Sequence, residues 1–407
     1  MSENGKNDTA LDRRDFLKGS VAVGLGTLLA AAGTKEAQAA APAAPAPPPP
    51  AAAPAAAPAA GKKLTMGDVL RVAREKLYPV CRVCPQCDGV ACAGEVPGMG
   101  GIGSGKGFKN NYNALADVEL VMRTFHNMTK PQMSLELYGH KLAMPFMSAA
   151  TGGVTYNMGN KMKDSEYINA IFGGCLDAGS LGMAADGIGD NLDVYQGRLN
   201  ILKTFDGKGM MTIKPKAQEE IIKRIRLIED AGAIAFAVDI DSAGRAARAL
   251  PGQIVEPKTA DQLAEIANST KLPFIIKGIM TVEEAKVAVE VGARGVVVSN
   301  HGGRVLDYTP ASVTVLPAIA DAVKGKITIF IDSGIRSGTD VLKCLALGAD
   351  CCLIGRPLVR GAHGGGREGV ALMMNSYKRE LMDAMVLTGT KDVRAVSRDI
   401  IAGGIQL

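Results

Sequence analysis

The sequence predicts an α/β fold, a (β/α)8 TIM barrel preceded by a cysteine-rich N-terminal segment. From about residue 140 onward, short apolar runs alternate with amphipathic stretches of helical period. The apolar runs lack strict alternation of apolar and polar residues, which is typical of strands buried on both faces. Eight such units follow one another, and this favours a closed barrel over the alternative, an open doubly wound sheet.

The predicted strands are four to six residues long, and apolar residues make up 47% of the chain, which is enough for a core of this size. We expect strands at 145–150, 181–185, 210–214, 235–239, 273–277, 295–299, 328–332 and 351–354, with helices between them, for example at 217–231, 282–291 and 338–347. The net charge is +5, but no basic run is long enough to indicate a nucleic-acid partner.

The N-terminus carries an export signature rather than a folded domain. Arg13-Arg14 precedes an uncharged stretch at 19–34, and Ala37-Gln38-Ala39 offers a small-x-small cleavage site. The pattern resembles a twin-arginine signal. It predicts a protein on the periplasmic or cell-surface side, tethered to the membrane if the signal stays uncleaved. The expected organisation is a signal peptide at 1–39, an Ala/Pro-rich linker at 40–61, a cysteine-rich segment at 62–110 and the barrel at 111–407.

Polar and glycine-rich motifs follow the last four predicted strands. Lys277 ends the fifth strand, and residues 299–304, 332–336 and 355–357 follow the sixth, seventh and eighth. Chemistry in such barrels sits at the C-terminal ends of the strands, where the loops after strands seven and eight often bind a phosphate. Arg336, two residues after Gly334, and Arg356, directly after Gly355, indicate a phosphate site there.

These motifs resemble those of a known family. The stretches Ile276-Lys277-Gly278, Ser299-Asn300-His301-Gly302-Gly303-Arg304, Asp332-Ser333-Gly334-Ile335-Arg336 and Ile354-Gly355-Arg356-Pro357 are similar to the signature of the FMN-dependent 2-hydroxy-acid oxidases and dehydrogenases, such as the glycolate and lactate enzymes. The similarity runs from about Gly103 to the C-terminus. It implies a flavoenzyme that oxidises a 2-hydroxy acid to the 2-keto acid and passes electrons to oxygen or to an electron-transfer acceptor.

The resemblance also implies residue roles. His301 would be the general base, Asp239 its partner, Arg304 the ligand of the substrate carboxylate, and Lys277 the cation beside the flavin N1 and O2. His126, His140 and His363 have no such setting and are expected to be structural or surface residues. The implied FMN-binding residues are Ala149, Ala150, Thr151, Thr212, Lys277, Ser299, His301, Asp332, Gly334, Arg336, Gly355 and Arg356.

The substrate side departs from the family pattern at three places. A tyrosine is missing from residues 100–105, Lys214 stands where the family has a second tyrosine, and Ala246 replaces the second of two arginines after the fourth strand. Substrate-binding residues are then expected to be His301, Arg304 and Lys214, with Arg245 or Arg248 as candidates for compensation. The alternatives are an isomerase of the type 2 isopentenyl diphosphate isomerase kind, or a non-catalytic flavin or iron–sulfur electron carrier. Family resemblance also implies a homo-oligomer.

Cys81, Cys84, Cys87 and Cys92 form a C-x2-C-x2-C-x4-C cluster, which is half of the eight cysteines. The spacing is close to that of iron–sulfur loops, while a zinc site with four cysteine ligands and a pair of disulfides are the other readings. Adjacent positions are too close for relaxed bridges, which favours a metal. The remaining cysteines are expected in the core.

Overall fold

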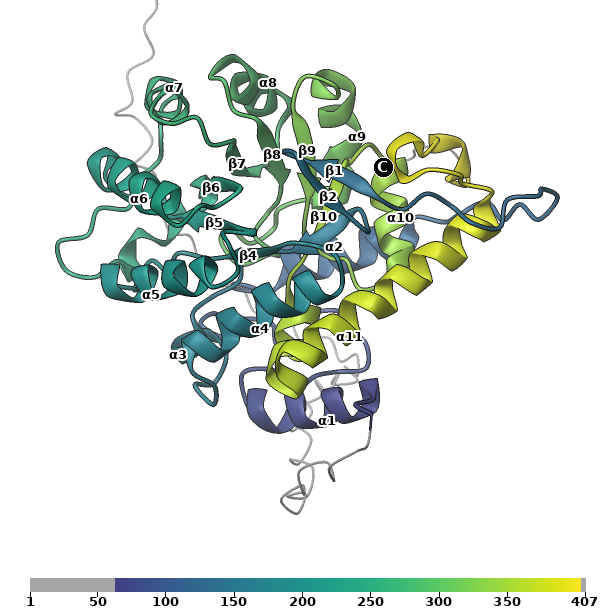
Figure 1. Ribbon diagram of the computed structural model, residues 1–407, viewed down its shortest axis with the longest axis horizontal. Coiled ribbons are helices and arrows are strands. Elements are labelled where there is room, and N and C mark those ends of the chain that lie inside the picture. The colour runs from purple at the N-terminus through teal and green to yellow at the C-terminus, as the bar shows by residue number, and fades with distance from the viewer. Residues whose placement is uncertain (1–62, 404–407) are drawn as a thin grey trace, which may run out of the picture. The chain divides into compact units, whose positions relative to one another are not determined.

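The computed structural model describes residues 63–403 (Figure 1). The predicted signal peptide at 1–39 and linker at 40–61 lie outside the described residues, as does the end of the chain at 404–407.

The predicted closed barrel is confirmed. Eight parallel strands form one sheet in the order β3-β10-β9-β8-β7-β6-β5-β4. The ends of this order meet because Thr151 bridges Ala184 and because Ser148 N donates to Leu181 O at 3.2 Å. The strands are β3 (Phe146–Ser148), β4 (Gly182–Ala184), β5 (Gly209–Ile213), β6 (Ala235–Asp239), β7 (Phe274–Ile279), β8 (Gly295–Val298), β9 (Thr328–Ile331) and β10 (Cys351–Ile354).

Side chains along each strand alternate between the barrel interior and the layer beneath the helices. In β7, for example, Ile275 packs in the interior cluster, whereas Phe274 and Ile276 pack in the cluster under the helices. The same period of two directs Lys277 and, in β6, Asp239 to the interior side at the C-terminal mouth. Strand parity therefore brings the charged residues of the site together.

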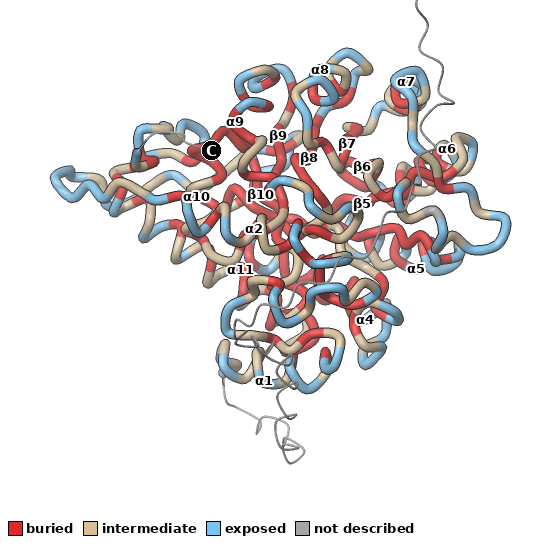
Figure 2. The backbone as a smooth tube through the Cα atoms, turned by 180° about the vertical axis from the view of Figure 1, so that it is seen from behind, coloured by how far each residue is buried: buried red, intermediate tan, exposed pale blue. Residues whose placement is uncertain are grey.

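Helices surround the barrel, and their buried faces are visible in Figure 2. The helices that follow the strands are α4 (Asp164–Asp177), α5 (Leu192–Lys203), α6 (Gln218–Asp230), α7 (Ala260–Asn268), α8 (Val282–Glu290), α9 (Ser312–Val323), α10 (Gly338–Ala346) and α11 (Arg356–Thr388). Short helical turns are α3 (Val154–Asn157), η1 (Ile240–Arg248), η2 (Val393–Ala395) and η3 (Arg398–Ile400). The three helices predicted at 217–231, 282–291 and 338–347 are confirmed within a residue at each end.

A hairpin closes the N-terminal end of the barrel. It consists of β1 (Leu135–Leu137) and β2 (His140–Leu142). Leu137 and Leu142 join the interior cluster, and the Tyr138 hydroxyl donates to the Arg294 carbonyl, immediately before β8, at 3.1 Å. The opposite, C-terminal end of the barrel is left for the site.

The described part of the cysteine-rich segment, residues 63–110, contains α1 (Met66–Leu77) and the first residues of α2 (Lys106–Asp117), and it is anchored to the barrel mouth. Helix α2 has no side-chain cap of its own; instead, the Asp307 carboxylate after β8 accepts from Ser104 N at 2.6 Å and Lys106 N at 3.0 Å. An anion there suits the positive end of a helix. Asn111 of α2 also donates to Asn300 Oδ1 at 2.8 Å. The segment is therefore part of the wall around the site.

Helix α1 packs on α11 through a glycine contact, and this contact yields a stability prediction. A Cβ on Gly364 would fall 2.0 Å from the Val69 carbonyl oxygen of α1. We expect Gly364→Ala to lower the free energy of unfolding by about 1–3 kcal/mol through overpacking. Gly197→Ala is the control, since that glycine lies in α5 with open space around it; it should stabilise the protein by about 0.5–1 kcal/mol. Urea unfolding measures both, and equal effects would contradict the packing argument.

Candidate active site

A cavity of about 590 Å³ opens at the C-terminal ends of the barrel strands. Most of the predicted site residues line it, namely Ala149, Ala150, Thr151, Lys214, Lys277, His301, Arg304, Asp332, Gly334, Arg336, Gly355 and Arg356. Met99 and Pro97 of the cysteine-rich segment line it as well. Three predicted residues, Thr212, Asp239 and Ser299, are buried beneath this lining.

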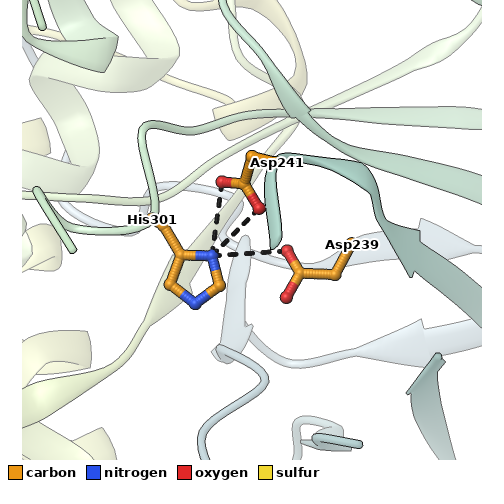
Figure 3. A group of neighbouring side chains, drawn as sticks. All are labelled: Asp239, Asp241 and His301. Carbon is orange, nitrogen blue, oxygen red and sulfur yellow. Dashed lines mark hydrogen bonds and ion pairs between the residues drawn. The ribbon is translucent and has the colours of Figure 1, made fainter. Parts of the chain in front are cut away.

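His301 stands at the centre of a carboxylate pair. Its Nδ1 atom lies 3.0 Å from Asp241 Oδ1 and 3.5 Å from Asp239 Oδ1 (Figure 3). Its φ of 58° lies in the left-handed region, which is unusual for a residue other than glycine and often marks functional sites. Two carboxylates on one ring nitrogen fix the ring, so Nε2 is the nitrogen available to a ligand.

Asp241 is the nearest carboxylate to the His301 imidazole, and no motif in the sequence predicted it. It lies two residues beyond β6, in the 3-10 turn η1. Asp239, the predicted partner, makes the longer contact to His301. Asp239 is instead bound mainly by two lysines, Lys214 and Lys277. The sequence does contain a sign of this role, because Asp241 follows the strand-end residue Asp239 by two positions.

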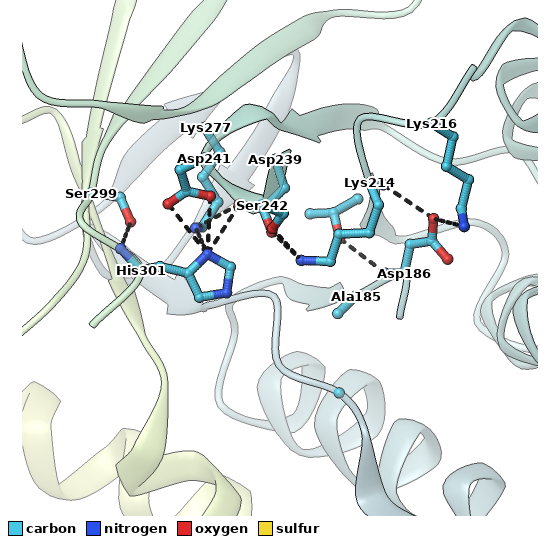
Figure 4. A network of polar contacts seen from close by, with 12 residues as sticks. Ala185, Asp186, Lys214, Lys216, Asp239, Asp241, Ser242, Lys277, Ser299 and His301 are labelled. Carbon is cyan, nitrogen blue, oxygen red and sulfur yellow. Dashed lines mark hydrogen bonds and ion pairs between the residues drawn. The ribbon is translucent and has the colours of Figure 1, made fainter. Parts of the chain in front are cut away.

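Asp239 is the hub of a buried ion network (Figure 4). The Lys277 ammonium lies 2.9 Å from Asp239 Oδ1 and 3.8 Å from Asp332 Oδ2. Lys214 contacts the other oxygen of Asp239 and donates to the Ser242 hydroxyl at 2.8 Å. The Asp239 and Lys277 side chains are each 3% exposed. Because buried charges are stable only when paired, each member of this network fixes the next.

The network shifts the pKa values of its members in opposite directions. Burial alone would raise the pKa of Asp239, but the ammonium groups of Lys214 and Lys277 outweigh burial and hold it well below its usual value. Burial raises the pKa of Asp241, despite the nearby Lys277. Burial would lower the pKa of Lys277, but Asp239 and Asp241 raise it above its usual value. Lys277 therefore presents a fixed positive charge at the cavity.

Two arginines line the cavity near His301. Arg304 Nη1 donates to the carbonyls of Gly98 at 2.6 Å and Gly100 at 3.0 Å, and its Nη2 donates to Asn157 Oδ1 at 3.0 Å. Arg245 Nη1 donates to the Arg304 carbonyl at 2.8 Å. Arg304 thus joins the N-terminal segment to the mouth of the barrel, and the Arg245 side chain contacts the backbone of Arg304. The side chain of Arg248 lies outside the described residues.

The part of the cavity lined by Gly355, Arg336 and Arg356 is suited to bind an anion. Gly355 precedes the first turn of α11, whose N-terminus carries a partial positive charge. Arg336 Nη2 is buried without a hydrogen-bond partner, although its Nε donates to the Cys87 carbonyl at 3.1 Å. Arg356 Nε donates to the Met99 carbonyl at 2.7 Å. An unsatisfied guanidinium nitrogen beside a helix N-terminus fits a phosphate.

Two further polar residues of the cavity were not predicted. Tyr156 and Asn157 come from α3, directly after β3, and line the cavity. Burial raises the pKa of Tyr156 to about 12, so its hydroxyl keeps its proton near neutral pH. Tyr156 is a phenol donor in a site that lacks both tyrosines expected from the family pattern. The sequence could have indicated Tyr156 only through its position, since it follows the first barrel strand by a few residues.

The remaining histidines and cysteines occupy the expected environments. His126 and His140 are exposed, and His363 is buried, with Nδ1 2.9 Å from the Val359 carbonyl. Cys175, Cys344, Cys351 and Cys352 are all buried.

Comparison with known families gives two matches. Residues 98–251 and 211–403 match the FMN-dependent dehydrogenase family, and residues 10–30 match the signal sequence of the twin-arginine translocation pathway. The second match confirms the predicted signal and supports export by that route. Among the described residues, we find no helix of the length and apolarity that crossing a membrane requires.

Characterised relatives resemble parts of the chain. It is 42% identical to mouse 2-hydroxyacid oxidase 2 over 166 residues. This alignment covers 40% of this chain and 47% of the relative. It is 54% identical to L-lactate dehydrogenase of Vibrio cholerae over 127 residues. That alignment covers 31% of this chain and 34% of the relative. These alignments span about a third to a half of each relative's length.

Solved structures resemble nearly the whole described chain. A mandelate oxidase variant with 2-hydroxy-phenylacetamide has a TM-score of 0.67 and 27% identity, covering 83% of this chain and 98% of the other. Another, with a monooxide FMN adduct, has a TM-score of 0.65 and 28% identity, covering 81% and 98%.

The ion network predicts an acid-dependent stability. Because the folded pKa of Asp239 lies below its unfolded value of about 3.9, its contribution is complete above about pH 5. The contribution is lost as the pH falls through the folded pKa. We expect Asp239→Asn to destabilise the protein by about 3–5 kcal/mol near neutral pH, since it leaves buried lysines without their main counter-ion. The variant should also lose less stability on acidification than the wild type.

Urea unfolding near neutral pH and at about pH 2 measures this difference, because the contribution is lost only well below the unfolded pKa of about 3.9. Asp206→Asn serves as the control because the Asp206 side chain is 83% exposed and pairs only with Lys208 in the described structure; it should change little. If wild type and Asp239→Asn lose the same stability on acidification, Asp239 is not the charged hub.

Proposed function

Because this chain belongs to the FMN-dependent dehydrogenase family, we propose that it binds FMN in the barrel-mouth cavity and oxidises a 2-hydroxy acid to the 2-keto acid. The observation that carries this proposal is the position of His301, which two carboxylates hold at the cavity beside two arginines. A base next to carboxylate-binding cations is what the oxidation of a hydroxy acid needs.

The residues present fit FMN. The cavity has a volume in the range of cofactor sites. Ala149 and Ala150 give one wall small side chains, which leave room for a flat ring. The unsatisfied Arg336 Nη2 and the α11 N-terminus at Gly355 fit the phosphate. Lys277 supplies the positive charge for the flavin ring.

Bound FMN would supply the acceptor for the two electrons that leave the substrate. The chain's own residues manage the proton and the position of the substrate. His301 Nε2 takes one proton, from the substrate hydroxyl or from Cα, and Asp241 stabilises the imidazolium that forms. Asp239 contributes less directly, since it shares its charge with Lys214 and Lys277.

Arg304 and Arg245 are proposed to hold the substrate carboxylate. A guanidinium fork binds a carboxylate with both charge and orientation. Arg245 would take over from the family arginine that Ala246 replaces. Lys214 is bound to Asp239 and Ser242, so we propose that it shapes the site electrostatically rather than by replacing the tyrosine hydroxyl. We propose instead that Tyr156 supplies the hydroxyl donor that the missing tyrosines would have provided.

The twin-arginine signal supports the proposal that the enzyme acts on the periplasmic or cell-surface side of the membrane. The electron acceptor there would be oxygen or an electron-transfer protein. A homo-oligomer, as the family resemblance implies, is also part of this proposal.

Anaerobic mixing with L-lactate, glycolate and longer 2-hydroxy acids tests the activity. We expect at least one of them to bleach the bound flavin. His301→Gln should keep FMN but slow flavin reduction by about 10²–10⁴-fold, because it removes the base. His140→Gln is the control, since His140 is exposed on β2, and it should react like the wild type. An enzyme that reacts equally fast without His301 would exclude it as the base.

The second arginine has its own test. We expect Arg245→Met to raise the KM for the hydroxy acid about 10- to 100-fold, as the loss of one charged hydrogen bond predicts. FMN content should stay unchanged. Arg226→Met is the control because Arg226 lies on α6 and pairs with Glu229, away from the cavity. If KM stays constant in Arg245→Met, the carboxylate is held by other groups.

A further inference from the structure

The four N-terminal cysteines line a pocket that the proposed oxidation does not use. Cys81, Cys84, Cys87 and Cys92 all border it, and none forms a disulfide. Met99 and Arg356 line both this pocket and the active-site cavity. The thiol pocket and the cavity proposed for the flavin are therefore separated by a single layer of side chains.

The spacing of the sulfurs distinguishes between metals. In a tetrahedral zinc site, with Zn–S bonds of about 2.3 Å, the sulfurs lie only about 3.8 Å apart. Among the described residues, only Asp239, Asp241 and His301 place three ligand atoms within 4.8 Å of one another, so no three of these thiols do. In an iron–sulfur cluster the thiolates bind different irons and stand farther apart. The pocket therefore fits a cluster better than a single zinc ion.

Arginines surround the thiol pocket. Arg356 and Arg360 are four residues apart in α11, so both side chains lie on the same helix face, and both line the pocket. Arg360 Nη1 donates to the Cys84 carbonyl at 3.5 Å, and its Nε is buried without a hydrogen-bond partner. Arg336 Nε donates to the Cys87 carbonyl at 3.1 Å. Guanidinium groups beside the loop that carries four thiols suit an anionic tetrathiolate centre.

One backbone donor is already directed at a sulfur of this loop. The backbone N–H of Val83 donates to Cys81 Sγ at 3.4 Å. Thiolates are the ligand form of cysteine, and hydrogen bonds to the sulfurs tune such centres.

The loop is also held in an unusual conformation. Val83 has a φ of 48° and Gly89 a φ of 86°. A Cβ on Gly89 would fall 2.6 Å from the Phe108 ring, so the loop is pressed against α2. On the other side, Pro85 and Gln86 are exposed. The pocket thus lies between the active-site cavity and solvent.

We propose that Cys81, Cys84, Cys87 and Cys92 bind an iron–sulfur cluster that carries electrons from the flavin cavity to an external one-electron acceptor protein. The relay, though not the cluster itself, rests on the proposed function. Each 2-hydroxy acid oxidised gives up two electrons and two protons. The electrons would leave FMN one at a time, so that the cluster would be reduced and reoxidised twice per turnover and two acceptor molecules would each gain one electron. Both protons, the one taken up by His301 and the one carried by the flavin, would be released to solvent.

Metal analysis of the anaerobically purified full chain tests the cluster. We expect iron and acid-labile sulfide in equal amounts, about two to four of each per chain, and an EPR signal after reduction with dithionite. Cys84→Ala and Cys87→Ala should each lower iron and sulfide at least about tenfold while keeping FMN. Cys175→Ala, a core cysteine on α4, is the control and should keep both. Cys84 is partly exposed, so its substitution should not affect folding.

Three outcomes would overturn the cluster: stoichiometric zinc without sulfide, two disulfides shown by intact mass and absence of free thiols, or iron that Cys84→Ala and Cys87→Ala leave in place. The relay is tested separately with cytochrome c as the acceptor. After hydroxy-acid addition we expect Cys84→Ala to bleach its flavin as the wild type does, but to reduce cytochrome c at least about tenfold more slowly. Equal rates would overturn the relay. If no hydroxy acid bleaches the flavin, the proposed function has failed, while the iron and sulfide contents still decide the cluster.

Discussion

The pairing of Asp239 with Lys214 and Lys277 at the mouth of the barrel is the interaction on which the site depends. All three groups are buried, so none is stable in its charged form without the others. The network fixes the Lys277 cation where a flavin would need it. It also leaves Asp241 to take the closest position to His301. One arrangement of charges thus sets both the cofactor side and the proton-transfer side of the cavity.

The N-terminal segment is a structural part of this arrangement rather than an appendage. Carbonyls of the segment accept hydrogen bonds from Arg304, Arg336 and Arg356, all of which line the cavity. The segment therefore orients the cations of the substrate and phosphate ends. The same packing places the pocket lined by the four cysteines next to the cavity, since Met99 and Arg356 line both. Substitutions in that segment should therefore alter the flavin site, even though most of the segment precedes residue 98, where the match to the family begins.

Much of the fold followed from local patterns, because strands buried on both faces give continuous apolar runs and because strand parity directs side chains such as Lys277 inward. The residues around the cavity were located through motifs at strand ends. Asp241 and Tyr156 were missed, since their positions depend on how the turns η1 and α3 fold back over the mouth. The docking of the cysteine-rich segment depends on long-range contacts, such as Asn111 with Asn300, that no local pattern reveals.

We propose that one cavity holds both flavin and substrate, between the arginine-lined phosphate end and His301. A crystal structure of the FMN-loaded protein with a bound 2-keto acid would show whether it does. We expect the flavin phosphate at the N-terminus of α11 beside Arg336 and the ring next to Lys277. The ligand carboxylate should lie against Arg304 or Arg245, with the C2 atom of the ligand facing His301 Nε2. A phosphate bound elsewhere, or a ligand out of reach of His301, would contradict it.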